Sequence, residues 1–123
     1  MALRGVRGAS TVESNNLPDI LNETEALLGA LLDKNACNKD DIASIFFSVT
    51  KDLDATFPAK AARKMGLLYT PLLCLNEIDV PNSLQKCIRI LIHINTDKSQ
   101  KDMIPIYLKG ADVLRPDVGD NRD

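Results

Sequence analysis

The sequence predicts an α+β domain in which one long and one short helix pack on a β-sheet. Residues 84–95 form an apolar run with isoleucine at every second position, as expected of a strand with one buried face. Residues 17–35 carry apolar side chains at the spacing of an amphipathic helix. Strand-like runs lie on both sides of that helix, at 2–7 and 42–50, an order that is typical of a βαβ crossover.

Size and composition limit what the chain can be. Its 123 residues suit one compact domain, which we place at 1–117, followed by a disordered tail at 118–123. Hydrophobic residues make up 45% and tryptophan is absent, so the core is mainly aliphatic and packing against partner subunits stays open. A net charge of -2 gives no broad attraction to nucleic acid or to an anionic membrane. An anion site must therefore be a local basic cluster.

The cysteines and the N-terminus bear on the compartment. Cys37, Cys74 and Cys87 are odd in number and lack Cys-x-x-Cys spacing, which argues against a disulfide framework and against a zinc site. The first residues lack the apolar core of a signal peptide, and no run approaches the roughly 20 apolar residues of a membrane span. We therefore expect a soluble, cytoplasmic protein that uses no metal and has no nucleic-acid or membrane partner.

Local signals place the elements of the first half. Residues 2–7 alternate apolar and basic side chains, and 8–10 are expected to end that strand, with a frayed basic terminus as the alternative. Asn16 is placed to cap the long helix. The short helix is expected to start at Pro58 and to end just before Gly66.

The second half is predicted to consist of short strands and turns. A strand at 72–75 and a turn at 80–83 precede the isoleucine strand, and 96–102 is expected to contain one helical turn. The remaining predicted pieces are a strand at 106–108, an extended segment at 113–116 and a polar tail at 117–123.

Arg89 is the most informative residue of the isoleucine strand. Period-two alternation points it away from the isoleucines, to the side of Cys87, Leu91 and His93. A guanidinium on a central strand is costly unless an anion meets it, and that anion is either a carboxylate of the chain or a ligand. The alternative is a strand-end arginine whose charged head reaches water.

The residue types exclude several kinds of catalysis. His93 is the only histidine, and its place in the isoleucine strand favours a core or edge residue over a general base. Without it no serine, histidine and acid triad can form, and the sequence contains no Gly-rich phosphate loop and no metal-ligand motif. Cations near strand ends remain, with three further polar side chains, and such a set suits a small dicarboxylate. The set comprises Arg7, Lys60, Arg63, Arg89 and Arg115, together with Tyr107, Cys74 and Glu77.

Several separate segments carry a resemblance to a known family. They read RGVRGASTVE at 4–13, FPAKAAR at 57–63, CLNEID at 74–79, KCIR at 86–89, and YL at 107–108 with VLRPD at 113–117. In this order and spacing the chain resembles, over residues 2–117, the small monofunctional bacterial chorismate mutases of the trimeric α/β-barrel type. The resemblance implies a mixed β-sheet, three chains forming a trimeric pseudo-α/β barrel, and sites at the clefts between neighbouring chains.

The resemblance also implies an activity and a set of roles. The activity is the conversion of chorismate to prephenate, an intramolecular Claisen rearrangement in phenylalanine and tyrosine biosynthesis that needs no cofactor. Arg89 would stabilise negative charge on the breaking ether oxygen, and Glu77 would bind the ring hydroxyl. Arg7 and Tyr107 would hold the side-chain carboxylate. The implied catalytic residues are Arg89, Glu77 and Arg7, and the other implied substrate-binding residues are Phe57, Lys60, Arg63, Leu73, Cys74, Leu75, Asn76, Tyr107, Leu114 and Arg115.

Three departures from the family pattern concern the loops. Segment 65–70 is one residue shorter than expected, Leu73 stands where a small hydroxyl residue is more usual, and 82–83 lacks the usual glycines. None of them touches a charged residue. Two other functions stay open: an imine-hydrolysing trimeric relative of the same fold, and a non-catalytic metabolite-binding domain.

Overall fold

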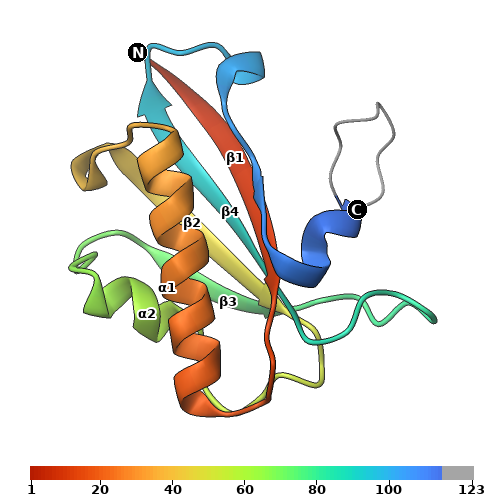
Figure 1. The fold of residues 1–123 in the computed structure, drawn as a ribbon. Helices are drawn as coiled ribbons and strands as arrows, with labels where there is room; N and C mark the ends of the chain where they lie inside the picture. The colour runs from red at the N-terminus through yellow and green to blue at the C-terminus, as the bar shows by residue number, and fades with distance from the viewer. Residues whose placement is uncertain (115–123) are drawn as a thin grey trace.

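A mixed five-stranded sheet forms the centre of the protein, in the order β3-β2-β4-β1-β5. The computed structural model describes residues 1–114. Its strands are β1 (Ala2–Thr11), β2 (Ile42–Val49), β3 (Leu72–Asn76), β4 (Cys87–Thr96) and β5 (Ile106–Tyr107). Helix α1 (Leu17–Lys34) crosses the sheet and the short helix α2 (Ala59–Lys64) lies beside it (Figure 1). The predicted α+β fold, with one long and one short helix, is confirmed.

The strand directions make the sheet mixed. β4 is antiparallel to both β1 and β2, whereas β3 is parallel to β2 and β5 is parallel to β1. β1 and β2 therefore run the same way with β4 between them, and α1 connects them. The predicted βαβ crossover is confirmed, but it spans an intervening strand.

The core lies between α1 and the isoleucine face of β4. Leu27, Leu28 and Leu31 are fully buried, and the four alternating isoleucines of β4 are at most 2% exposed. Burying one such side chain contributes roughly 2 kcal/mol to the free energy of folding, so the contact between α1 and β4 is a major source of stability. Asn16 caps α1 as predicted, because its side-chain oxygen accepts a hydrogen bond of 2.8 Å from the backbone N–H of Asp19.

β1 is longer than the sequence predicts. Instead of ending at residue 7, it continues to Thr11, with Gly8 opposite Ile90 and Ser10 opposite Ile88. A Cβ on Gly8 would lie 2.6 Å from the carbonyl oxygen of Ile106 in β5. Gly8 is therefore present because a neighbouring strand approaches closely, and it does not end β1.

The C-terminal end also differs from the prediction. Val113 and Leu114 belong to a 3₁₀ helix, Lys109–Leu114, and not to an extended segment. Lys109 starts it with a φ of +51°, and Leu114 packs beside Ala9 and Cys87 in a small apolar cluster. The predicted pieces beyond residue 114, including Arg115 and the polar tail, lie outside the described residues.

Two further 3₁₀ turns lie at Lys39–Asp41 and Gln100–Asp102, the second where one helical turn was predicted. The described residues contain no helix that is both long and apolar enough to cross a membrane.

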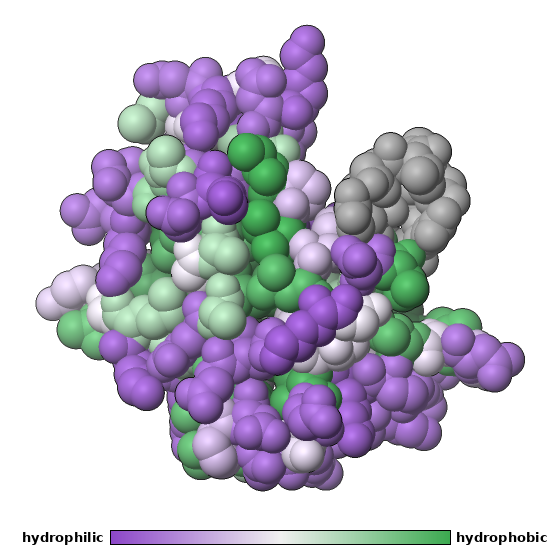
Figure 2. All heavy atoms as spheres, viewed as in Figure 1, coloured by the Kyte–Doolittle hydropathy of each residue, from purple (hydrophilic) through white to green (hydrophobic). Residues whose placement is uncertain are grey.

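The two faces of the sheet are unequally covered. The helix side presents a mostly hydrophilic surface with scattered apolar areas (Figure 2). On the opposite face the strands present Leu3, Leu73, Leu75 and Leu91 to solvent, each exposed by more than a third. Arg89 lies on this uncovered face, as the alternation in β4 predicts.

Candidate functional site

Arg89 is met by a carboxylate of its own chain. Its Nε lies 3.3 Å from Oε2 of Glu77, the residue that follows β3. The other carboxylate oxygen, Oε1, accepts a hydrogen bond of 3.0 Å from Ser48 in β2, and the backbone N–H of Glu77 donates to Val49. The side chains of Arg89 and Glu77 keep 30% and 26% of their surface exposed. The ion pair thus compensates the charge of the guanidinium while leaving part of both side chains exposed to a ligand.

The register of the sheet places the other polar groups beside this pair. Ser48, Arg89, Ala9 and Tyr107 are successive cross-strand neighbours in β2, β4, β1 and β5. Ala9 is the small member of this row, so two longer side chains flank it. Arg7 lies two residues before Ala9 in β1 and points to the same face.

These residues line a cleft of about 610 Å³, which we call the arginine cleft. Its polar lining comprises Arg7, Ser48, Asn76, Glu77, Arg89 and Tyr107, and its apolar lining includes Phe46, Leu75, Ile78 and Leu91. A volume of this size accommodates a small organic ligand. Two guanidinium groups, one phenol and one carboxylate can bind an anion that also carries a hydroxyl group.

Other predicted site residues line a second hollow, of about 420 Å³, which we call the Phe57 hollow. Phe57, Lys60 and Cys74 line it, whereas Leu75 and Asn76 line both spaces. Phe57 is 67% exposed, so within one chain its ring has no opposing wall.

The predicted residues therefore fall into two groups within one chain. Arg63 and Leu73 are exposed and line neither space, and Leu114 is buried beside Ala9. Arg115 lies outside the described residues.

Sequence reasoning missed the residues that the register brings in. Ser48 was not predicted, although the alternation of residues 42–50 puts it on one face with Phe46. Only the pairing of Ser48 with Arg89 shows that this face is the one that matters.

His93 is half-buried on the uncovered face of the central strand β4, so it lies neither in the core nor on an edge strand, the two places that the sequence favours. Its Nδ1 lies 3.0 Å from Oγ of Ser44, and its ring meets the ring of Phe46 edge to face. It does not line the arginine cleft.

Burial makes the cysteines poorer nucleophiles. Burial raises the pKa of Cys87 to about 11, and this outweighs the opposite influence of neighbouring Arg89. Burial also raises the pKa of Cys74, although a backbone hydrogen bond from Ala59 opposes the shift. Because the thiolate is the reactive form, these shifts lower the reactivity of both side chains at neutral pH. Among the described residues no group of three His, Cys, Asp or Glu side chains is placed to hold a metal ion.

We predict that Cys87 resists a thiol reagent at pH 8 as long as the protein is folded. Its pKa rises from 9.0 to about 11 on folding, so the folded state holds the proton more tightly, and this group destabilises the protein as pH rises through that window. The measurement is the labelling rate of a Cys37→Ser, Cys74→Ser variant, in which Cys87 is the one remaining cysteine, with the same variant unfolded in denaturant as the control. Labelling of Cys87 as fast in the native state as in denaturant would contradict the prediction.

The fold and the cleft define a class of protein with two arginines, a carboxylate and a phenol around one cleft on a sheet face. The family described as chorismate mutase type I matches residues 3–118. The chorismate mutase AroH of Bacillus subtilis (strain 168) is 41% identical over 119 residues, covering 96% of this chain and 94% of that protein. The chorismate mutase AroH of Thermus thermophilus is 42% identical over 117 residues, covering 94% of this chain and 96% of that protein.

A solved structure agrees with these relatives. The chorismate mutase from Clostridium thermocellum superposes with a TM-score of 0.88 at 56% identity, covering 89% of this chain and 98% of that chain. The chain belongs to the type I chorismate mutase family.

Proposed function

We propose that this protein converts chorismate to prephenate in the arginine cleft, as a step of phenylalanine and tyrosine biosynthesis. The observation that carries the proposal is the Arg89–Glu77 pair, fixed on a sheet face and open to a cleft that a second arginine lines. Membership of the family supplies the reaction.

The reaction asks little of the protein beyond placement and charge. One C–O bond breaks while one C–C bond forms within the same molecule, and no proton is transferred. The ether oxygen gains negative charge as its bond breaks, and a preorganised guanidinium stabilises that charge. Arg89 takes this role, because Glu77 and the β4 backbone hold it in place. Holding the substrate in its reactive conformer supplies the remainder of the rate enhancement.

The other groups of the cleft bind the substrate. Arg7 and Tyr107 take the side-chain carboxylate, and Glu77 accepts a hydrogen bond from the ring hydroxyl. Their lining of one cleft from two different strands and the end of a third supports this assignment. A hydrogen bond from Ser48 to Oε1 and an ion pair between Arg89 and Oε2 keep the carboxylate of Glu77 oriented.

We further propose that three chains assemble and that neighbouring chains complete each site. The exposed leucines of the uncovered sheet face support an assembly, because a monomer rarely leaves a broad apolar area in water. The exposed ring of Phe57 supports sharing, since the opposing wall it lacks would come from the arginine cleft of a neighbour. Lys60, Arg63 and the backbone around Cys74 would then meet the substrate from the second chain.

The three free cysteines support a location in the reducing cytoplasm.

The decisive experiment is to add chorismate to the pure protein and follow the loss of its diene absorbance, with light scattering on the same sample. We expect turnover far above the spontaneous rate and a mass of three chains. Binding of chorismate without turnover would favour the metabolite-binding alternative. Hydrolysis of an imine by the same sample, with no effect on chorismate, would favour the imine-hydrolysing alternative.

A further inference from the structure

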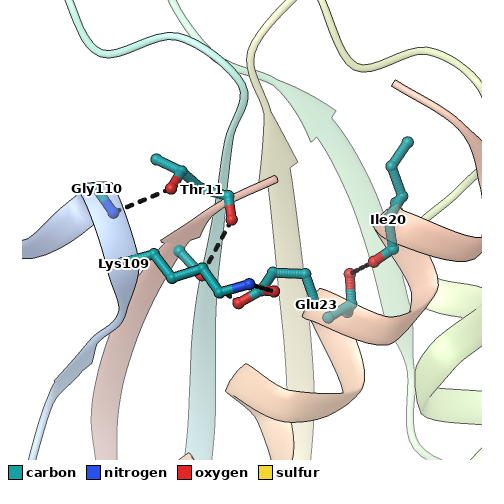
Figure 3. A network of polar contacts seen from close by, with 7 residues as sticks. Thr11, Ile20, Glu23, Lys109 and Gly110 are labelled. Carbon is teal, nitrogen blue, oxygen red and sulfur yellow. Dashed lines mark hydrogen bonds and ion pairs between the residues drawn. The ribbon is translucent and has the colours of Figure 1, made fainter. Parts of the chain in front are cut away.

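A buried carboxylate ties the C-terminal segment to the body of the fold. Glu23 lies on α1 and is 9% exposed. Its Oε1 accepts a hydrogen bond of 2.6 Å from the fully buried Ser10, and its Oε2 lies 2.6 Å from Nζ of Lys109 (Figure 3). One residue on, the backbone N–H of Gly110 donates to Oγ1 of Thr11 at 3.0 Å. We call Ser10, Glu23 and Lys109 the Glu23 clasp.

The clasp lies close along the chain to a residue that lines the arginine cleft. Lys109 comes two residues after Tyr107, which lines the cleft, and begins the 3₁₀ helix that ends at Leu114. Lys109 adopts a φ of +51°, in the left-handed region that side chains other than glycine rarely adopt. Its contact with Glu23 therefore holds the chain at the point where it leaves β5 and turns.

The charge on Glu23 calls for an explanation beyond packing. A leucine face against a sheet needs no carboxylate, and a buried carboxylate with only one neutral hydrogen bond is costly. Lys109 supplies the compensating charge, and its own pKa is raised by the hydrogen bond to Glu23. Because the Lys109 side chain is 60% exposed, solvent can replace this contact, so the clasp can open without unfolding α1.

We propose that Glu23 and Lys109 are positioning residues, which hold Tyr107 in the arginine cleft and thereby set the affinity for the substrate. This inference rests on the proposed function. Opening the clasp should weaken substrate binding, since Tyr107 would no longer be held in place, while the chemistry at Arg89 continues. We expect Lys109→Met and Glu23→Gln each to raise KM about tenfold and to change kcat by less than about threefold.

The two variants separate positioning from simple attraction of an anion. Lys109→Met removes a positive charge and Glu23→Gln removes a negative one, so an effect of overall charge on a dianion would move KM in opposite directions. An open clasp moves KM upward in both. Lys64→Met is the matched control, because Lys64 pairs with Glu25 of the same helix α1 at 3.3 Å and lines neither space.

Hydrogen exchange of the backbone in residues 104–114, measured without substrate, gives a readout that does not depend on activity. We expect faster exchange in Lys109→Met and Glu23→Gln than in the parent and in Lys64→Met. In kinetics, the KM of Lys109→Arg should lie between those of Lys109→Met and the parent. A parent that exchanges normally but does not turn over chorismate would refute the proposed function while leaving the clasp testable by exchange. An active parent with faster exchange but unchanged KM in both variants would overturn the inference, as would unchanged exchange.

Discussion

Arg89→Ala is expected to lower kcat at least roughly a hundredfold, because one preorganised donor to a developing oxyanion contributes about 3 kcal/mol to transition-state stabilisation. KM should change less, since the charge that Arg89 serves grows mainly in the transition state. The fold should persist, because Glu77 keeps its hydrogen bond from Ser48 and a quarter of its side-chain surface in water. Steady-state kinetics and circular dichroism of the same preparation measure both expectations.

Two further variants sharpen this test. Arg89→Lys should restore only part of the rate, because a single ammonium on a different stem cannot reproduce a planar guanidinium. Arg4→Ala is the control, since Arg4 lies on the opposite face of the sheet, where its Nε donates to the Lys98 carbonyl. A kcat near the parent value in Arg89→Ala would refute the assignment.

The pH profile tests the absence of proton transfer. We expect kcat of the parent to be nearly flat between about pH 6 and 9, because the rearrangement transfers no proton. A bell-shaped profile arises when a general acid and a general base take part. A bell that disappears in His93→Ala would instead assign the chemistry to a general base.

The second large effect is expected from mixing two inactive chains. Arg89→Ala damages the arginine cleft, and Phe57→Ala with Arg63→Ala damages the side that we assign to the neighbouring chain. In randomly mixed symmetric trimers about a quarter of the sites would combine two intact halves, so activity should recover to about that fraction of the parent value. The measurement is the rate after unfolding the two variants together and refolding them.

The control for this mixing experiment carries all the substitutions on one chain, mixed with Arg89→Ala. No site in such trimers has both halves intact, so its activity should stay near background. Well-mixed trimers of the first pair that recover no activity would show that each site is built within one chain.

The helices and strands that short-range sequence patterns specify could be predicted from the sequence. The leucine spacing of α1, its cap at Asn16 and the alternating isoleucines of β4 are short-range patterns, and all three are confirmed. The same alternation placed Arg89 on the face away from the core. Such features depend on neighbours within a few residues, which is why periodicity reveals them.

Which carboxylate meets Arg89 could not be read from the pattern, because the answer depends on strand register. Glu77 reaches Arg89 from the end of β3, two strands away in the sheet, with Ser48 of β2 between them. The roles of these residues in catalysis, and the assembly of three chains, remain predictions that the experiments above address.

The sequence by itself determined the fold class, the helix faces, the orientation of Arg89 and the family resemblance, since each follows from residue types at short spacing or in a fixed order. Only the tertiary structure decided where β1 ends. Gly8 lies inside the strand because the carbonyl of Ile106, almost a hundred residues away in the chain, leaves no room for a Cβ. The tertiary structure also decided that Glu23 on a mostly apolar helix face is paired with Ser10 and Lys109. Contacts between residues so distant in the chain leave no local periodicity, and the folded backbone alone brings them together.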